Sequence, residues 1–149
     1  MKISSILDLQ KITSSINKIL LPGDVIFLYG QIGVGKTTFV RLLINNYENE
    51  KKLKKSEVLS PTFIIVFEYD VKKLTIKHYD LYRLKNDRDI KNIGLFEDLE
   101  QTITLIEWPE LIKKKPLNRI DLFLEYGEGM NERSLNIKTS GRLKSYEFQ

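Results

Sequence analysis

The chain has 149 residues, of which 42% are hydrophobic and 30% charged, and its formal net charge is +4. This is the length and composition of one ordinary folded domain, so we expect residues 1–149 to form a single domain rather than a nucleotide domain plus a separate catalytic domain. The chain contains no cysteine and one histidine, which excludes disulfides, thiolate metal sites, cysteine nucleophiles and metal sites built from several histidines.

The N-terminal stretch MKISSILDLQKI carries Asp8 and other polar residues within its apolar part, unlike the long apolar core of a signal peptide. No run of residues approaches the length of about 18 apolar residues that a membrane-spanning helix needs. We therefore expect a cytoplasmic protein with no membrane partner. The positive net charge is compatible with a nucleic-acid partner but does not establish one.

The first part of the chain shows a helix, a buried strand and a second helix. Apolar residues recur at spacings of three and four over residues 3–20, which predicts an amphipathic helix that ends at the turn 21–24. The continuous apolar run 25–29 predicts a strand that is buried on both faces. Residues 36–47 again follow the helical period.

The rest of the chain is predicted to be mostly strands. Residues 63–69 and 74–79 are expected to form two strands joined by a hairpin turn, and a short helix is expected within residues 86–99. Three further strands are predicted, at residues 103–107, 120–126 and 134–138. The pattern indicates an α/β fold, namely a three-layer P-loop NTPase domain with a mixed, mainly parallel central sheet and a β-hairpin.

Between the buried strand and the second helix, residues 30–38 read GQIGVGKTT and contain the P-loop pattern G-x-x-x-x-G-K-T. Glycines at such positions can adopt positive φ angles that turn backbone amides toward a phosphate. The lysine brings a positive charge to the outer phosphates, and the threonine after it offers a hydroxyl to Mg²⁺. The expected nucleotide-binding residues are Gly33, Val34, Gly35, Lys36, Thr37 and Thr38.

Hydrolysis also needs a carboxylate at the metal and a group that orients the attacking water. Asp80 and Glu107 each follow a predicted strand, and strand ends gather ligands at one edge of an α/β sheet. Both are candidate catalytic residues, and together with Thr37 they are candidate metal ligands. Their spacing does not divide the two roles between them. The alternative for each is an exposed carboxylate that merely follows a strand.

Two neighbours of Asp80 in the sequence allow more than one interpretation. We expect His78, the single histidine, to be a structural residue with satisfied hydrogen bonds, and a general base is the alternative. We expect Arg83 to form a salt bridge that fixes the loop of Asp80. The alternative for Arg83 is an arginine finger that acts on the γ-phosphate.

Three motifs follow the P-loop in a set order: SPTF at residues 60–63, HYDLYR at 78–83 and IEWP at 106–109. Together with the P-loop they resemble the TsaE (YjeE) family of small bacterial P-loop ATPases, which act in the synthesis of threonylcarbamoyladenosine in tRNA. The resemblance covers about residues 4–140, and this set of motifs in this order is highly specific.

The resemblance implies a protein that binds ATP and hydrolyses it slowly with Mg²⁺. The implied partner is the TsaB–TsaD heterodimer, in which TsaD transfers the threonylcarbamoyl group to a tRNA adenosine beside the anticodon. The ATPase would reset this heterodimer for further turnover and would not itself be the transferase. tRNA would then be an indirect partner.

Carried over by motif, the resemblance places the loop amides at the phosphates and Thr37 at Mg²⁺. It places Asp80 and Glu107 at the metal and the water. Thr62 lies in a segment that resembles a switch near the γ-phosphate, and Trp108 would flank the nucleotide pocket or the partner face.

The chain departs from the family near the adenine, where a serine or threonine is common at the start of the first helix. In the ungapped register this position falls on Leu9, and a shifted register offers Ser5 or Thr13. Arg133 loosely fits a C-terminal arginine of the family and is a candidate for contact with a phosphate or a partner.

Two other functions stay open on the residues alone. A small-molecule kinase of nucleoside type shares the P-loop but usually needs an arginine-rich lid, and the chain has six arginines without such a segment. A nucleotide-gated binding module would bind ATP without meaningful turnover.

Overall fold

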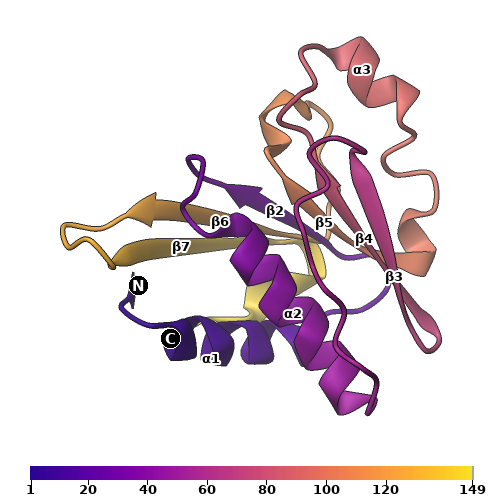
Figure 1. The fold of residues 1–149 in the computed structure, drawn as a ribbon. Helices are drawn as coiled ribbons and strands as arrows, with labels where there is room; N and C mark the ends of the chain where they lie inside the picture. Colours follow the sequence, from indigo (N-terminus) through magenta and orange to yellow (C-terminus); the bar gives the residue numbers. More distant parts are fainter. Residues whose placement is uncertain (149) are drawn as a thin grey trace.

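The computed structural model of the chain describes residues 1–148. Strands and helices alternate through the first half, and strands dominate the second half (Figure 1). In chain order the elements are β1 (Lys2–Ile3), α1 (Ile6–Asn17), β2 (Val25–Tyr29), α2 (Lys36–Glu50), β3 (Val66–Val71), β4 (Leu74–Asp80), α3 (Asp87–Asn92), a 3₁₀ turn (Leu99–Gln101), β5 (Thr102–Glu107), a 3₁₀ turn (Pro109–Leu111), β6 (Arg119–Tyr126), β7 (Arg133–Ser140) and a 3₁₀ turn (Gly141–Ser145).

The strands form one seven-stranded sheet in the order β1-β7-β6-β2-β5-β4-β3. The four central strands β6, β2, β5 and β4 pair in parallel, whereas the outer strands on both sides pair antiparallel. The predicted mixed sheet with a parallel centre is confirmed, and so is the hairpin, which is formed by β3 and β4. Because the central strands are parallel, the carboxyl ends of β2, β4 and β5 lie at the same edge of the sheet.

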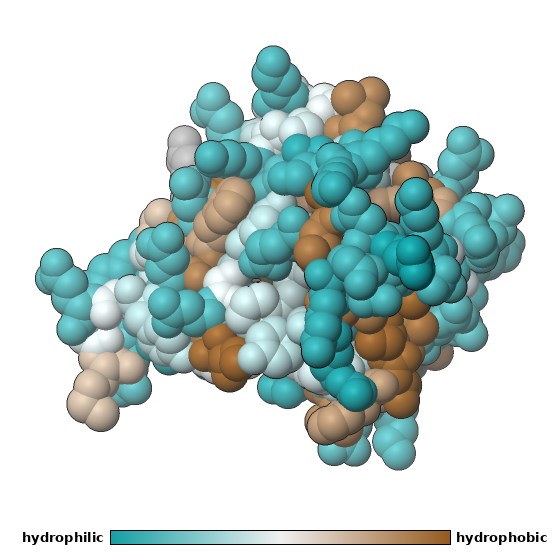
Figure 2. Space-filling model, turned by 90° about the horizontal axis from the view of Figure 1, so that it is seen from above, coloured by the Kyte–Doolittle hydropathy of each residue, from teal (hydrophilic) through white to brown (hydrophobic). Residues whose placement is uncertain are grey.

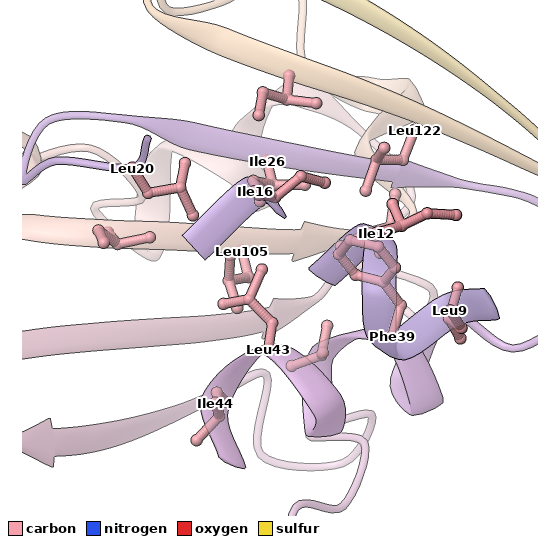
Figure 3. Packing of buried hydrophobic residues seen from close by; sticks show 14 of the residues in the cluster. Leu9, Ile12, Ile16, Leu20, Ile26, Phe39, Leu43, Ile44, Leu105 and Leu122 are labelled. Carbon is pink, nitrogen blue, oxygen red and sulfur yellow. The ribbon is translucent and has the colours of Figure 1, made fainter. Parts of the chain in front are cut away.

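Helices α1 and α2 pack against each other and cover one face of the sheet (Figure 1). Their inward residues form one continuous core with residues from β2, β5 and β6, and the labelled side chains of Figure 3 point into it. Among these residues Ile16, Ile26, Phe39 and Leu43 are completely buried. Burial of each such side chain stabilises the fold by about 1.5–3 kcal/mol.

Part of the other face of the sheet, at β2, β4 and β5, is covered by the segment that contains α3. Ile90 and Ile93 of this segment pack against a second core cluster, to which Phe27 and Ile106 belong. β2 therefore sends alternate side chains to the two clusters, as a strand buried on both faces must. The three-layer α/β arrangement expected from the sequence is confirmed.

Two element boundaries differ from the sequence prediction for identifiable reasons. Helix α1 begins only at Ile6, because Ser5 caps it and exchanges hydrogen bonds with Asp8 in a capping box, while Lys2–Ile3 pairs with β7 as a short strand. Strand β3 begins at Val66 instead of residue 63. The amide of Ile65 donates to the Pro61 carbonyl at 2.6 Å, and Ile65 has a φ of 74°, so residues 61–65 form a tight turn.

The remaining differences are small. Helix α2 continues three residues beyond the predicted end, to Glu50, and the helix predicted within residues 86–99 is limited to α3. Gly94, with a φ of 58°, follows the end of α3 in the left-handed conformation that terminates many helices.

Within residues 1–148, none of the helices has the length and apolar character to cross a lipid bilayer. Seen from above, hydrophilic side chains cover most of the visible face, and the hydrophobic ones form separate patches (Figure 2).

Candidate nucleotide-binding site

The P-loop connects the carboxyl end of β2 to the first turn of α2. Gly33 and Gly35 have φ angles of 76° and 120°, which side-chain-bearing residues rarely adopt. Gly35 is the N-cap of α2, and no side chain caps its first amides. A 15-residue helix with uncapped N-terminal amides favours an anion at this end. The local structure therefore suits phosphate binding, as the motif predicts.

Lys36 is buried beneath this loop. Its Nζ donates to the carbonyls of Gly30 and Gln31 at 2.6 and 2.9 Å and lies 4.1 Å from the centre of the Trp108 ring. Burial lowers the pKa of the Lys36 ammonium, and the nearby carboxylates of Glu107 and Asp80 partly oppose this shift. Phosphate oxygens would add negative charge beside the same ammonium and favour its charged form.

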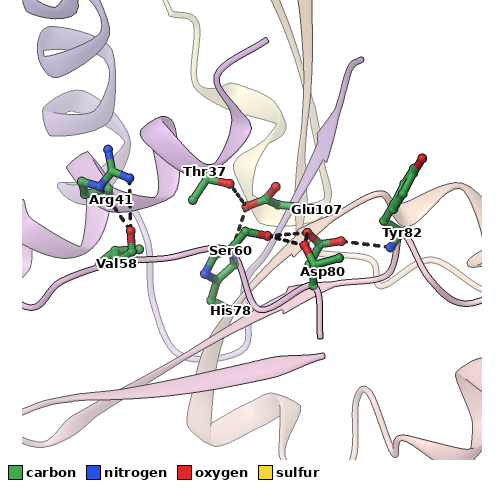
Figure 4. Close-up of polar contacts among 9 residues, drawn as sticks. Thr37, Arg41, Val58, Ser60, His78, Asp80, Tyr82 and Glu107 are labelled. Carbon is green, nitrogen blue, oxygen red and sulfur yellow. Dashed lines mark hydrogen bonds and ion pairs between the residues drawn. The ribbon is translucent and has the colours of Figure 1, made fainter. Parts of the chain in front are cut away.

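Glu107, the last residue of β5, faces the start of α2. Its Oε1 accepts hydrogen bonds from the Thr37 hydroxyl and, at the same distance of 2.8 Å, from Nε2 of His78 (Figure 4). Both Glu107 and His78 are buried. The sequence prediction that His78 is a structural residue with satisfied hydrogen bonds is half right, because Nδ1 has no hydrogen-bond partner among the described residues.

Asp80, the last residue of β4, lies opposite Glu107 in the parallel register of β4 and β5. Its Oδ2 accepts from the hydroxyls of Ser60 and Thr62, the latter at 2.8 Å, and its Oδ1 accepts from the amide of Tyr82 at 2.9 Å (Figure 4). Asp80 thus holds the Ser60–Thr62 segment against the sheet edge. Sequence reasoning assigned no role to Ser60, although it lies in the SPTF motif.

These parts enclose a pocket of about 370 Å³. It is lined by residues of the P-loop and of the first turn of α2, and by Ser60, Thr62, Asp80, Tyr82, Glu107 and Trp108. The structure therefore brings the candidate catalytic and metal residues Thr37, Asp80 and Glu107 together at one edge of the sheet, although they come from three separate segments. Their chemical roles stay predictions.

Trp108 has a φ of 58° and a ψ of 56°, which is the left-handed region and unusual for a bulky side chain. This backbone conformation directs the ring toward the P-loop, where it contacts Lys36 and packs against Tyr82 with 4.8 Å between ring centres. Strained backbone of this kind concentrates at functional sites. Trp108 was a candidate from its motif, but local sequence carries no signal for this conformation.

Two arginines lie at the borders of the site. Arg83 makes no ion pair within residues 1–148 and instead donates to the Phe63 carbonyl at 3.4 Å, so the expected salt bridge at the Asp80 loop is wrong. Arg133 donates to the Val34 carbonyl at 3.2 Å. It also lines a second pocket of about 350 Å³, on the other side of the P-loop, together with Ser5, Leu9, Gly33, Gly35 and Thr38.

The donor set at Thr37 and Glu107 fits a magnesium ion. No group of three His, Cys, Asp or Glu residues that could form a metal cage occurs in residues 1–148. Mg²⁺ is usually held by one or two carboxylates together with phosphates and water, rather than by a cage of protein ligands. A hydroxyl and a carboxylate 2.8 Å apart beside a phosphate-binding loop provide oxygen donors of this kind.

Comparison with known proteins decides the family. Residues 3–135 match the family model described as "Threonylcarbamoyl adenosine biosynthesis protein TsaE". The chain belongs to the TsaE family. This membership confirms the resemblance drawn from the motifs, and the family role lies in tRNA threonylcarbamoyladenosine biosynthesis.

Relatives named "tRNA threonylcarbamoyladenosine biosynthesis protein TsaE" occur in several bacteria. The Rickettsia bellii protein is 41% identical over 108 residues, covering 70% of this chain and 72% of the relative. The Bacillus subtilis protein is 31% identical over 135 residues, and the match covers 89% of this chain and 78% of the relative. The match to the Rickettsia felis protein, 38% identical over 104 residues, spans only 58% of that relative.

A solved structure extends the likeness to the fold. The crystal structure of YdiB from Bacillus subtilis superposes with a TM-score of 0.72 at 26% identity, covering 95% of this chain and 84% of that one. The TsaE fold is thus present over almost the whole chain, and the P-loop of such a fold implies nucleotide binding.

Proposed function

We propose that this TsaE-family chain binds ATP and hydrolyses it slowly with Mg²⁺ to support the TsaB–TsaD heterodimer in threonylcarbamoyladenosine modification of tRNA. The observation that carries the proposal is the hydrogen bond between Thr37 and Glu107 beneath a complete P-loop. This bond joins the loop's metal-binding hydroxyl to a strand-end carboxylate. The chain supplies the ATPase and not the transferase, and tRNA is an indirect partner.

The phosphates of ATP bind to the amides of the P-loop and of the first turn of α2. The Lys36 ammonium, which now donates to two loop carbonyls, turns to the outer phosphates. The base lies in the second pocket, where Ser5 and Leu9 are close to Arg133. Thr13 is excluded as a base contact, because it is buried and donates to the Gln10 carbonyl within α1.

The two carboxylates have different tasks in this proposal. Glu107 serves the metal, because it is bonded to the hydroxyl that binds Mg²⁺ in P-loops. When bound, the ion neutralises charge on the outer phosphates. Asp80 orients the attacking water, because it lies one strand further from the P-loop and holds the Ser60–Thr62 segment. Thr62 is then placed to contact the γ-phosphate.

The test is Mg²⁺-dependent ATP hydrolysis by the purified chain, alone and with a TsaB–TsaD pair, with Lys36→Ala as the blank. We expect slow turnover that rises when the pair is added and is lost in the blank, because the ammonium that contacts the phosphates is gone. Removal of such a charged hydrogen-bond donor weakens ATP affinity about tenfold or more.

Turnover that the pair does not change would contradict the supporting role, and a panel of nucleosides and other small phosphate acceptors would then test for a kinase. Unchanged ATP affinity of Lys36→Ala in calorimetry would contradict the phosphate-binding assignment itself. Full cellular function of a Glu107→Ala variant without turnover would favour a nucleotide-gated binding module.

A further inference from the structure

His78 is a buried side chain with hydrogen-bonding capacity that the proposed function does not yet use. It lies near the end of β4, its exposed fraction is 0%, and it is the single histidine of the chain. Within residues 1–148 the imidazole makes one hydrogen bond, from Nε2 to Oε1 of Glu107 at 2.8 Å, and Figure 4 shows the ring directed toward this carboxylate.

The surroundings of the ring determine where its proton lies. Nδ1 is buried and has no hydrogen-bond partner among residues 1–148. A proton on Nδ1 would therefore be buried without an acceptor, which is costly, whereas a proton on Nε2 is donated to a carboxylate. The geometry thus places a proton on Nε2, which donates it to the Glu107 carboxylate.

This donor fixes the orientation of the Glu107 carboxylate. Oε1 accepts from both Thr37 and His78, which approach it from α2 and from β4. Oε2 makes no hydrogen bond within the described residues, while Glu107 lines the nucleotide pocket. The two donors therefore hold one oxygen at the sheet edge and leave the other free to face the pocket.

We propose that His78 is a positioning residue, a hydrogen-bond donor that holds Oε1 of Glu107 so that Oε2 is presented to the metal side of the nucleotide pocket. The inference rests on the proposed function, since it assigns Glu107 to the metal. His78 does not contact nucleotide in this arrangement and acts only through Glu107. Donors that orient a metal-side carboxylate typically change metal affinity or activity by about 10–100-fold when removed.

The first test replaces the donor while keeping the bulk of the side chain. His78→Leu removes the hydrogen bond to Glu107, and His78→Gln carries an amide NH₂ with a reach similar to that of Nε2. We expect His78→Leu to lower kcat for Mg²⁺-ATP about 10–100-fold, and His78→Gln to recover most of this loss. The control Ile76→Val changes a buried residue of the same strand on the same face, and we expect its kcat to stay close to that of the unmodified chain.

The second test does not depend on activity. Because the chain has one histidine, ¹⁵N-labelled protein gives a single imidazole in a long-range ¹H–¹⁵N NMR spectrum, and we expect its proton on Nε2. A proton on Nδ1, equal losses of kcat in the Leu and Gln variants, or an unchanged kcat in His78→Leu would each overturn the inference.

The experiment separates the inference from the function on which it rests. If the unmodified chain shows no hydrolysis that depends on Lys36, the proposed function fails. The inference is then judged by the NMR spectrum and by calorimetry of ATP binding with and without Mg²⁺, where His78→Leu is expected to lose most of the gain in affinity that Mg²⁺ gives. If the His78→Leu variant folds normally and Mg²⁺ raises its ATP affinity as much as in the unmodified chain, the inference is overturned.

Discussion

Asp80 and Glu107 lie directly opposite each other on neighbouring strands, yet each is bonded to a different part of the site. Glu107 is bonded to Thr37 of the P-loop helix, whereas Asp80 is bonded to Ser60 and Thr62 of a separate loop. The two carboxylates have the same chemistry, but they end neighbouring strands and therefore have different surroundings. This difference is the physical basis for dividing metal and water between them.

At this residue scale the division can be tested with two isosteric variants. We expect Glu107→Gln to lose most of the Mg²⁺-dependent gain in ATP affinity, because the charge beside the Thr37 hydroxyl is removed. We expect Asp80→Asn to keep that gain but to lower kcat about 10²-fold or more, as the loss of a water-orienting carboxylate does.

Isothermal titration calorimetry with Mg²⁺ and with EDTA measures the first effect, and steady-state hydrolysis measures the second. The opposite pattern, in which Asp80→Asn loses the Mg²⁺ effect and Glu107→Gln keeps it, would exchange the two roles.

At the scale of elements, β6 lies so close to the start of the P-loop that position 30 has no room for a side chain. A Cβ added at Gly30 would lie 2.5 Å from the Leu124 carbonyl oxygen of β6 and 2.8 Å from a methyl group of Val34. A Cβ added at Gly35 would meet no heavy atom within 4 Å. Both glycines have positive φ angles, 146° and 120°, so the contacts of position 30 with β6 and with Val34 distinguish them sterically.

We therefore expect Gly30→Ala to lower the free energy of unfolding by about 1–3 kcal/mol more than Gly35→Ala does. This difference is the typical cost of overpacking a protein core. Both variants share the backbone cost of a side chain at positive φ, so Gly35→Ala is the matched control. Urea unfolding followed by the fluorescence of Trp108, the single tryptophan, measures the difference. Equal midpoints for the two variants would show that the loop moves away from β6 without cost.

A second link between elements joins the P-loop helix to the segment that carries Ser60. Arg41 of α2 donates from Nε and Nη2 to the Val58 carbonyl, both at 3.2 Å (Figure 4). Arg41 lies one helical turn after Thr37, on the helix whose first turn is expected to hold phosphate. The helix and the Ser60–Thr62 segment are thus connected both directly, through Arg41, and across the sheet edge, through Asp80 and Glu107.

At the scale of the whole molecule, the end of the chain is joined to the turn before β2. Arg142 donates from Nε and Nη2 to the carboxylate of Asp24, and from Nη2 to the Ile19 carbonyl at 2.9 Å. Asp24 is completely buried and also accepts from the Leu21 amide at 2.7 Å. This ion pair holds the C-terminal 3₁₀ turn against the start of the central strand.

We expect Arg142→Met to destabilise the fold by about 3–5 kcal/mol, because a buried carboxylate is left without its partner. The double variant Asp24→Asn with Arg142→Met should recover a large part of this loss, since the buried charge is gone while the Leu21 amide keeps an acceptor. Urea unfolding followed by circular dichroism measures the stability of the unmodified chain, of Arg142→Met and of the double variant. A loss of less than about 1 kcal/mol in Arg142→Met would match an ordinary surface pair and contradict this expectation.

The features that depend on local pattern could be predicted from the sequence. The apolar run at residues 25–29, the P-loop and the following helical period predicted β2, the loop and α2, because each signal lies within a few consecutive residues. The order of the motifs also indicated the TsaE family. The predicted starts of α1 and β3 were wrong, because the helix cap at Ser5 and the tight turn at residues 61–65 interrupt the hydrophobic period.

Which of these residues come into contact depends on the packing of distant segments. Asp80, Glu107, Thr37 and Ser60 come from four segments, and only the parallel order β2-β5-β4 brings them to one edge. The hydrogen bond of His78 to Glu107, the absence of an ion pair at Arg83 within residues 1–148 and the left-handed Trp108 likewise depend on contacts between distant segments. Local sequence carries no signal for such contacts, because strand order and side-chain burial are set by packing of the whole sheet.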